Sequence, residues 1–356
     1  MKDDSSASPA PWPVLAPWLA DQLGELLAQR GHAWLLHGPS GLGQYALGLE
    51  LARAWLCEAR QADIATQTAA PQPACGQCAS CHMLAARTHP DLVMLMPETV
   101  LLEQGWPLSE KAQGDIDEKK RKASREIRVE AMQNAIEFAQ RTNARGRGKV
   151  VLVYPAERMN HITANGLLKT LEEPVGDVRF ILATEAAHQL LPTIRSRCQP
   201  FAMRWPEQSA ALAWLGQMAQ DHGINASAQD SANALQSAGG RPLDALHSLQ
   251  SGLAQHWQSL PKSIAAGHLG ALAGLSPQDA LDALQKLCHD LMAVRAGAGP
   301  RFFEASSLPK APGLRALAAW AKALKDLAKT IDHTWKAELL LENLVAQAHK
   351  TLAIAR

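Results

Sequence analysis

A glycine-rich stretch near the amino end constrains the fold more than any other feature. It reads His37-Gly38-Pro39-Ser40-Gly41-Leu42-Gly43-Gln44-Tyr45. Gly38 and Gly43 have the spacing of the phosphate-binding pattern G-x-x-x-x-G-K-[ST]. An apolar run at 33–37 precedes the stretch, and a helical pattern at 46–52 follows it. A strand, a loop and a helix in this order predict an α/β domain with a parallel sheet.

The chemical groups that should follow the glycines are missing. Gln44 stands where a lysine would bind phosphate, and Tyr45 stands where a small hydroxyl would bind Mg²⁺. Gln44 carries no charge, and the ring of Tyr45 is too large for the place of a serine or threonine. Two interpretations stay open from this stretch alone: a phosphate-binding loop that has lost its chemistry, or a glycine-rich turn of another α/β protein.

Composition sets broad limits. The chain has 356 residues, of which 47% are hydrophobic, so it can form two or three domains with a sizeable core. The formal net charge is only +1, and tight independent DNA binding would require a concentrated basic surface. No apolar run is long enough to span a membrane, and the polar residues 1–6 lack a signal-peptide core. We therefore expect a soluble, cytoplasmic protein.

Three of the six cysteines crowd into the stretch Cys75-Gly76-Gln77-Cys78-Ala79-Ser80-Cys81. In a cytoplasmic chain of this size, such clustering indicates a metal site and not disulfides. Two Cys-x-x-Cys steps bring three thiolates to one point, and tetrahedral Zn²⁺ requires a fourth ligand. The adjoining His82 is one candidate, and a set of reduced free cysteines is the alternative. Cys198 and Cys288 are interpreted as buried apolar positions.

The rest of the chain falls into two halves. Buried strands are predicted at 91–96, 149–154 and 179–184, in alternation with helices. From 206 onward the sequence has helical periodicity and no convincing strand.

Two insertions interrupt the first half. The segment 58–74 is rich in Ala, Gln, Thr and Pro and predicts a mobile loop. The segment 97–124 contains a charged run at 115–122. We interpret Lys119-Lys120-Arg121-Lys122 within it as a solvated loop. A nucleic-acid contact is the less favoured alternative, because acidic residues directly precede these four.

Several motifs now stand in a fixed order. They are the glycine frame, Cys-x-x-Cys-x-x-Cys, Thr88-His89-Pro90-Asp91, the strand ending at Tyr154, Leu167-Leu168-Lys169-Thr170-Leu171-Glu172-Glu173-Pro174, and Ser196-Arg197-Cys198. This order resembles the clamp-loader branch of the AAA+ ATPases, and within it the delta-prime subunits of the bacterial DNA polymerase III clamp loader. The resemblance covers residues 30–205, and the later part matches only as helical segments.

The resemblance implies an architecture. Residues 1–205 would form a RecA-like AAA+ domain with a parallel sheet, in which residues 57–82 form an inserted zinc module. Residues 206–255 would form a small helical lid domain. Residues 256–356 would form an all-α collar domain that joins the subunits into a ring.

Departures from the family pattern concern the groups that handle nucleotide. Active clamp-loader ATPases carry a metal-binding aspartate and a water-activating glutamate where this chain has Tyr154 and Pro155. Glu157 lies one turn further on and is interpreted as a solvated helix-start residue. Leu243 takes the position of the sensor-2 arginine, with Arg241 nearby. Together with Gln44 and Tyr45, these losses predict that the chain does not hydrolyse ATP.

Other residues keep the family pattern. The resemblance assigns the first zinc cysteine to Cys57, which gives the ligand set Cys57, Cys75, Cys78 and Cys81. It makes Arg197, between Ser196 and Cys198, an arginine finger that acts on ATP held by a neighbouring subunit. Thr184 occupies the sensor-1 position, where we expect a satisfied polar residue at a strand end. Lys169, Glu172 and Glu173 form either a solvated helix face or a surface toward the neighbouring subunit.

The resemblance also implies partners. These are the gamma/tau ATPase and delta subunits, and, through the complex, the sliding clamp and primer-template DNA. An alternative function is a catalytically active AAA+ ATPase with an atypical nucleotide site. A zinc-dependent DNA-binding module is disfavoured by the near-neutral charge.

Overall fold

The computed structural model describes residues 12–60, 72–331 and 336–353. Two compact units divide the chain, Met1–Trp205 and Pro206–Arg356. Most of the predicted mobile loop at 58–74 lies outside the described residues. Among the helices that are described, none combines the length and apolarity needed to cross a membrane.

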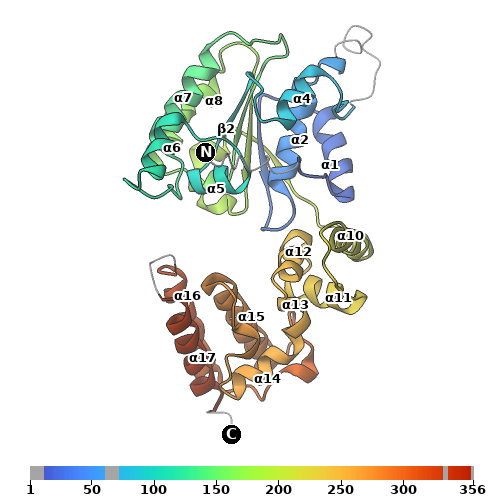
Figure 1. The fold of residues 1–356 in the computed structure, drawn as a ribbon, viewed down its shortest axis with the longest axis vertical. Helices are drawn as coiled ribbons and strands as arrows, with labels where there is room; N and C mark the ends of the chain where they lie inside the picture. Colours follow the sequence, from blue (N-terminus) through green and yellow to red (C-terminus); the bar gives the residue numbers. More distant parts are fainter. Residues whose placement is uncertain (1–11, 61–71, 332–335, 354–356) are drawn as a thin grey trace, which may run out of the picture. The chain divides into compact units, whose positions relative to one another are not determined.

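The first unit is built on a five-stranded sheet in the order β2-β3-β4-β1-β5, with all neighbouring strands parallel. The strands are β1 (Ala33–His37), β2 (Leu92–Leu95), β3 (Lys149–Val153), β4 (Val178–Thr184) and β5 (Gln199–Ala202). Every residue of β3 is buried, because helices cover both faces of the sheet (Figure 1). The predicted parallel sheet is confirmed.

Helices α1 and α2 lie on one side of this sheet, and α7 and α8 lie on the other (Figure 1). The helices of this unit are α1 (Pro17–Ala28), α2 (Gln44–Leu56), α4 (Ala79–Ala85), α5 (Glu98–Glu103), α6 (Glu110–Asp117), α7 (Val129–Gln140), α8 (His161–Glu172) and α9 (Pro192–Arg195). Val151, Phe180 and Leu182 of the sheet pack with Leu167 and Leu171 of α8 in one apolar core. This core fixes the strand ends that carry the candidate site residues.

The insertion at 97–124 is partly helical, and residues 119–122 lie outside its helices, as the predicted loop requires. It contains α5 and α6, and the side chain of Ser109 caps α6 by accepting a hydrogen bond from the backbone N–H of Ala112 (3.3 Å). Lys119, Lys120 and Lys122 are exposed, as predicted.

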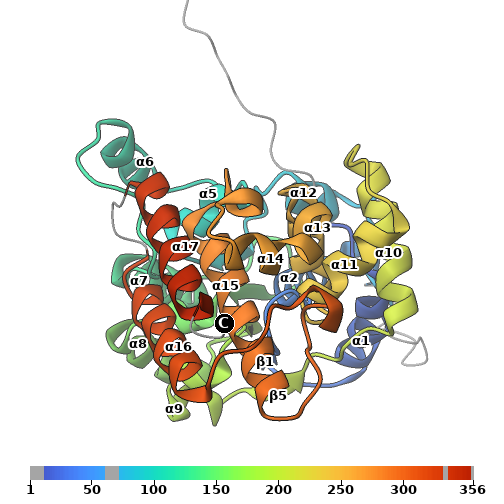
Figure 2. The same ribbon diagram turned by 90° about the horizontal axis from the view of Figure 1, so that it is seen from below.

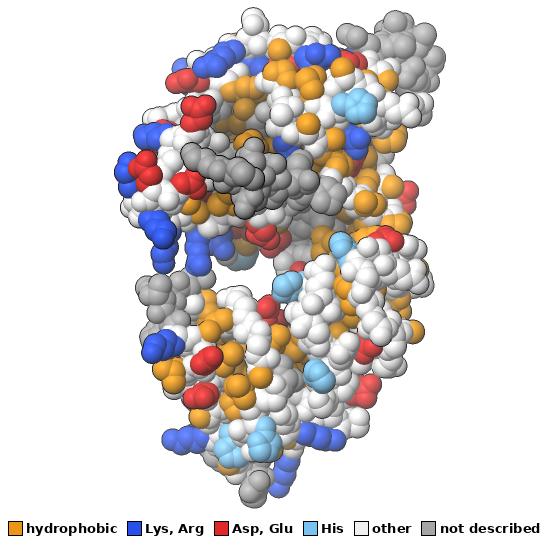
Figure 3. Space-filling view, viewed as in Figure 1, with side chains coloured by type: hydrophobic (Ala, Val, Ile, Leu, Met, Phe, Trp, Pro, Cys, Tyr) orange, Lys and Arg blue, Asp and Glu red, His pale blue; other side chains and the backbone are white. Residues whose placement is uncertain are grey.

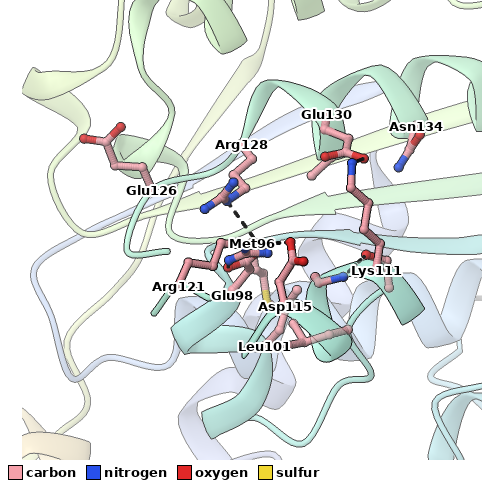
Figure 4. A pocket seen from close by; sticks show the side chains of 14 residues that line it. Met96, Glu98, Leu101, Lys111, Asp115, Arg121, Glu126, Arg128, Glu130 and Asn134 are labelled. Carbon is pink, nitrogen blue, oxygen red and sulfur yellow. Dashed lines mark hydrogen bonds and ion pairs between the residues drawn. The ribbon is translucent and has the colours of Figure 1, made fainter. Parts of the chain in front are cut away.

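Arg121, from the same charged run, is instead bound to a buried carboxylate. It donates two hydrogen bonds to Glu98, at 2.5 and 2.8 Å. Figure 4 shows Glu98 between Arg121 and Arg128, beside a cavity of about 250 Å³. The backbone N–H of Ser124 also donates to Glu98. These bonds therefore join the two ends of the insertion, and the charge pattern of the sequence alone does not predict this.

The second unit is helical throughout its described residues. Its helices are α10 (Gln208–Asp221), α11 (Ala228–Ser237), α12 (Pro242–Gln250), α13 (Leu253–His256), α14 (Leu260–Ala265), α15 (Pro277–Arg295), α16 (Leu314–Ala328) and α17 (Ala337–Ala353). Figure 2 shows α15, α16 and α17 beside one another. They share an apolar core that includes Leu287, Leu317 and Leu344. The predicted absence of strands after 206 holds for the part of this unit that is described.

Charge is mixed on the face of the molecule seen in Figure 3. Basic and acidic side chains are interspersed there, with no broad surface of one sign. This agrees with the balanced composition of 35 basic and 34 acidic residues.

Candidate functional site: the glycine loop, the cysteine cluster and the Ser-Arg-Cys motif

The glycine loop at 38–43 joins β1 to α2, as the sequence predicts. Gly41 and Gly43 have φ values of 75° and 99°, in the left-handed region that favours glycine. Gly43 is also the N-cap of α2, so the first residue of the helix is Gln44. The frame of a phosphate-binding loop is therefore present, and its backbone requires glycine at positions 41 and 43.

Gln44 closes this loop from inside. Its side chain is buried, with 1% of its surface exposed. The amide nitrogen donates to the backbone carbonyls of Gly38 (2.9 Å) and Pro39 (2.7 Å). Both amide hydrogens are used in this way, and no positive charge is offered to an anion. The lysine position thus holds a neutral group that stabilises the loop itself.

Two tyrosines lie at the positions where the family resemblance expects metal-handling groups. The rings of Tyr45 and Tyr154 stack with 5.2 Å between their centroids and 26° between their planes. Trp106, from the insertion at 97–124, donates its indole N–H to the Tyr45 hydroxyl (2.7 Å). The Tyr154 hydroxyl donates to Glu185 (3.2 Å). Burial raises the pKa of Tyr154 well above its ordinary value, so this side chain remains a neutral phenol.

Glu157 corrects one expectation from the sequence. Its carboxylate is not simply solvated, because it accepts hydrogen bonds from the Thr184 hydroxyl (2.7 Å) and from the backbone N–H of Glu185 (3.2 Å). Thr184 is buried and hydrogen-bonded at the end of β4, as predicted. Glu157 is therefore engaged in holding the end of β4.

The weak sensor-2 candidate is engaged within its own unit. Arg241 donates its Nε–H to the backbone carbonyl of Ala238 (2.8 Å) and pairs with Asp244 (3.0 Å). Leu243, at the position expected for the arginine, is 37% exposed. These contacts give Arg241 a local role at the start of α12.

The four predicted zinc cysteines come together. Their sulfur atoms all lie within 4.8 Å of one another in the group Cys57, Cys75, Cys78 and Cys81. The Sγ–Sγ distances are 3.9 Å for Cys57–Cys78 and for Cys75–Cys81. A tetrahedral site with Zn–S bonds of about 2.3 Å requires sulfurs about 3.8 Å apart, so the geometry fits zinc. His82 is exposed and lies outside this group.

The environments of these thiols differ. Backbone N–H groups of Gln77 and Cys78 point at the Cys75 sulfur and lower its pKa to about 6. Burial raises the pKa of Cys81 to about 12. Burial likewise raises the pKa of Cys198 to about 12 and that of Cys288 to about 11. Both of these last cysteines are buried, as predicted.

A polar network joins the cysteine cluster to the sheet, and sequence reasoning missed it. Glu58, next to Cys57, accepts hydrogen bonds from Ser80 (3.0 Å) and from Arg145 Nε (2.6 Å). His89 contacts the same Ser80 hydroxyl (3.1 Å). Asp91 accepts backbone N–H bonds at the turn before β3, including that of Arg145 (2.9 Å). The Thr88-His89-Pro90-Asp91 motif therefore links the cluster to the starts of β2 and β3.

The Ser-Arg-Cys motif follows the short helix α9. Ser196 is its C-cap and donates its hydroxyl to the Thr193 carbonyl (3.2 Å), while Cys198 is buried. Arg197 is partly exposed, with 27% of its side chain accessible. Its guanidinium donates to Glu172 at 3.1 and 3.3 Å and to the Thr193 carbonyl at 3.0 Å. The motif thus anchors the backbone on either side of an arginine at the surface.

Glu172 connects two of the motifs that the sequence singled out. It belongs to the Leu171-Glu172-Glu173 run at the end of α8, and Lys169, Glu172 and Glu173 are all exposed. Arg195, the neighbouring arginine, is also exposed and lies close enough to His37 that it adds to the effect of burial in lowering the pKa of that imidazole. The two arginines therefore face different surroundings.

The family described as "DNA polymerase III, delta subunit" matches residues 22–207. The chain belongs to the delta-prime family of DNA polymerase III subunits. A DNA polymerase III subunit delta' of Pseudomonas aeruginosa is 38% identical over 232 residues, which are 64% of this chain and 60% of that protein. One from Yersinia pestis is 30% identical over 334 residues, which are 89% of this chain and 87% of that protein.

The chain is also similar to another subunit of DNA polymerase III. A DNA polymerase III subunit tau of Salmonella typhimurium is 30% identical over 181 residues, which are 51% of this chain and 23% of that protein. The match to the Pseudomonas relative spans less than two thirds of that relative's length, whereas the Yersinia match spans most of it.

Proposed function

We propose that this delta-prime family chain is a non-hydrolysing subunit of a DNA polymerase III clamp loader. It helps to place the sliding clamp on primer-template DNA, together with gamma/tau ATPase and delta subunits. Its contribution to ATP hydrolysis is Arg197, delivered to ATP held by a neighbouring subunit. Membership of the family and the similarity to a tau subunit support this assignment.

The stack of Tyr45 on Tyr154 carries the non-hydrolysing part of the proposal. Phosphoryl transfer needs a metal ion on the phosphates and a positioned water, and proteins supply these through hydroxyl and carboxylate ligands. Here both metal-handling positions hold aromatic rings in contact with each other. Gln44 donates its amide hydrogens to the loop carbonyls and carries no charge, so the cation that would neutralise the phosphates is missing as well.

Arg197 supports the second part of the proposal. A guanidinium is always charged and offers donors in a fixed fork, which suits the charge that spreads over a transferring phosphoryl group. Arg197 is at the surface, between a capping serine and a buried cysteine that fix its backbone. Its partner Glu172 is 58% exposed, so the pair can be exchanged for a phosphate at little cost.

The remaining regions receive structural roles in the proposal. Residues 1–205 form the AAA+ domain, 206–255 a helical lid and 256–356 a collar through which subunits assemble. Zinc, held by Cys57, Cys75, Cys78 and Cys81, would tie the end of α2 to α4. When bound it supplies cross-linking and no catalytic chemistry, since all four positions are protein ligands.

Reconstitution tests the proposed function. The full-length chain is mixed with gamma/tau and delta subunits, and the complex is isolated by gel filtration and assayed for loading of the clamp onto primed DNA. We expect a stable complex that loads the clamp only when the chain is present. Equal loading by the other subunits without the chain would contradict the proposal.

A further inference from the structure

A pocket of about 510 Å³ lies at the end of the sheet where the strands begin, opposite to the end that carries the glycine loop. It is formed where β3, β4 and β1 begin, which are neighbours in the sheet. Its charged lining residues are Arg30, Arg147, Arg179 and Asp177, and Trp55 forms part of its wall. The glycine loop follows the carboxyl end of β1, so the pocket is separate from the degenerate nucleotide site.

The charges in this pocket are not balanced. Three arginines face a single acid, and the one ion pair between them, from Arg179 Nε to Asp177, is long at 3.6 Å. Arg30 and Arg147 form no ion pair with any residue that the structure describes. The Nε atom of Arg147 is buried and has no hydrogen-bond partner there. Guanidinium groups stay charged when they are brought together, so this arrangement lacks an anion that would satisfy it.

The pocket is held in shape by its surroundings. The Arg179 guanidinium lies 5.2 Å from the ring centroid of Trp55, in a cation–π contact. Arg147 stands between Gly146 and Gly148, which both have positive φ. A side chain at Gly148 would come within 2.5 Å of Asp177, so the turn that presents Arg147 requires glycine there. The side chain of Arg179 and the backbone turn that carries Arg147 are therefore held in place by the protein itself.

We propose that this pocket binds phosphate, supplied either by a nucleic-acid backbone or as free phosphate. Three arginines and one aspartate leave two positive charges, which match a phosphate dianion or two successive backbone phosphates. Arginine forks also fit phosphate oxygens in two-pronged geometry. A chain with a net charge of +1 would bind weakly through one such pocket alone, so the contact would add to others within a complex. This site goes beyond the role proposed for Arg197 and does not depend on it.

The test compares two double variants of the full-length chain with the same loss of charge. Arg30→Ala/Arg147→Ala removes two arginines from the pocket. Arg295→Ala/Arg315→Ala removes two exposed arginines from the second unit and is the matched control. Binding of a fluorescein-labelled 20-residue oligothymidine is measured by anisotropy at several salt concentrations, and binding of inorganic phosphate by calorimetry. Thermal melts show that each variant is folded, and Arg147→Lys provides a milder change at the same position.

Affinity for the oligonucleotide should fall about tenfold in the pocket double variant and stay near that of the unchanged protein in the control. The slope of log K against log salt should become shallower by about 1.4, because two single-strand phosphate contacts are lost. Loss of phosphate binding in the pocket variant, with no oligonucleotide binding by any form, would identify free phosphate as the source. Equal binding by both double variants would overturn the proposal. So would binding only of polyglutamate, which serves as a polyanion without phosphate.

Discussion

The two ends of helix α2 differ in whether their side chains bond to one another or leave donor atoms for a ligand. At its start, beside the glycine loop, the chain's own side chains occupy the positions of the ligand-binding groups: Gln44 bonds to the loop, and Tyr45 stacks on Tyr154. At its end, Cys57 joins three other cysteines whose sulfurs stand at metal-binding distances. The family frame is present at both ends. What differs is whether the side chains satisfy one another or leave their donor atoms for a ligand.

A binding site can lose its function in two ways: it can lose its ligand groups and stay open, or it can be occupied by the protein's own side chains. A site that has only lost its ligand groups would leave an open space, which a ligand or a single reverting substitution could use. At the glycine loop, Gln44 bonds to the loop carbonyls, Tyr45 stacks on Tyr154, and Trp106 of the insertion bonds to Tyr45, so in our proposal the site is closed. The cysteine cluster shows no such replacement. The following predictions test this contrast, from the largest expected effect to the smallest.

Removal of a zinc ligand should have the largest effect. Cys81→Ser breaks the four-sulfur set at a fully buried position, and structural zinc sites contribute directly to folding. We expect loss of the metal and a decrease of several kcal/mol in the free energy of unfolding. Metal analysis and chemical denaturation of freshly purified, reduced protein measure both.

His82→Ala is the matched control for this prediction, since His82 is exposed and outside the cluster. It should retain one zinc per chain. Zinc retained by Cys57→Ser but lost by His82→Ala would assign the fourth ligand to His82 instead.

Opening the aromatic stack should come next. Tyr154→Ala removes a ring packed on Tyr45 and leaves a cavity, so it should lower the free energy of unfolding by about 3 kcal/mol. Tyr154→Phe keeps the ring and loses only the hydrogen bond to Glu185, at a cost of about 1 kcal/mol or less. Urea denaturation of both variants gives the comparison. Equal effects of the two variants would mean that the stack does not fill the site.

Arg197→Ala tests the chain's proposed contribution to hydrolysis elsewhere. Arginine fingers contribute about 10³–10⁵ in rate at a single site, but a ring with several ATP sites would lose only part of its turnover. We expect folding and assembly to be unchanged and DNA- and clamp-stimulated ATP hydrolysis to fall several-fold in a reconstituted complex. Arg195→Ala, two residues away, is the control and should have a smaller effect. Clamp loading at the unchanged rate with Arg197→Ala would exclude the finger role.

The smallest effect concerns the insertion that carries Trp106. The pKa of Glu98 is lowered because its bonds with Arg121 and the Ser124 N–H outweigh burial, which acts in the opposite direction. A carboxylate with a lowered pKa in the folded state stabilises above its ordinary pKa of 4.5, and this stability is lost as the pH falls through the folded-state pKa.

Glu98→Gln should therefore lower the free energy of unfolding at pH 7 by about 1–2 kcal/mol. The difference from the unchanged protein should shrink below pH 4.5. Denaturation curves at pH 7 and pH 3.5 measure it, and a difference that is the same at both values would contradict the assignment.

Local sequence pattern was sufficient for much of this fold. The continuous apolar run at 150–154 predicts the buried strand β3, and Cys-x-x-Cys spacing places three sulfurs at one point before any tertiary contact is known. The glycine pattern at 38–43 predicts the loop, and Gly41 and Gly43 are required there because their φ values are positive.

What the sequence did not reveal depends on contacts between distant residues. Nothing local shows that Arg121 turns back to Glu98, that Trp106 reaches Tyr45 across 61 positions, or that Glu157 holds Thr184. The basic pocket has the same origin, since Arg30, Arg147 and Arg179 meet only because three strands begin side by side. The residues at the lysine, hydroxyl and aspartate positions could be read from the sequence, but the stack of Tyr45 on Tyr154 and the hydrogen bond from Trp106 could not.

The most direct test of the central claim is the ATPase activity of the isolated chain, measured with Mg²⁺ after rigorous purification, alongside Gln44→Lys. We predict no turnover above background in either protein. The lysine alone would restore neither the metal ligands, whose positions hold Tyr45 and Tyr154, nor the water-activating glutamate, whose position holds Pro155. Turnover that stays in constant proportion to the chain through successive purification steps would contradict the account. Activity in Gln44→Lys alone would show that the site had lost a charge but had not been closed.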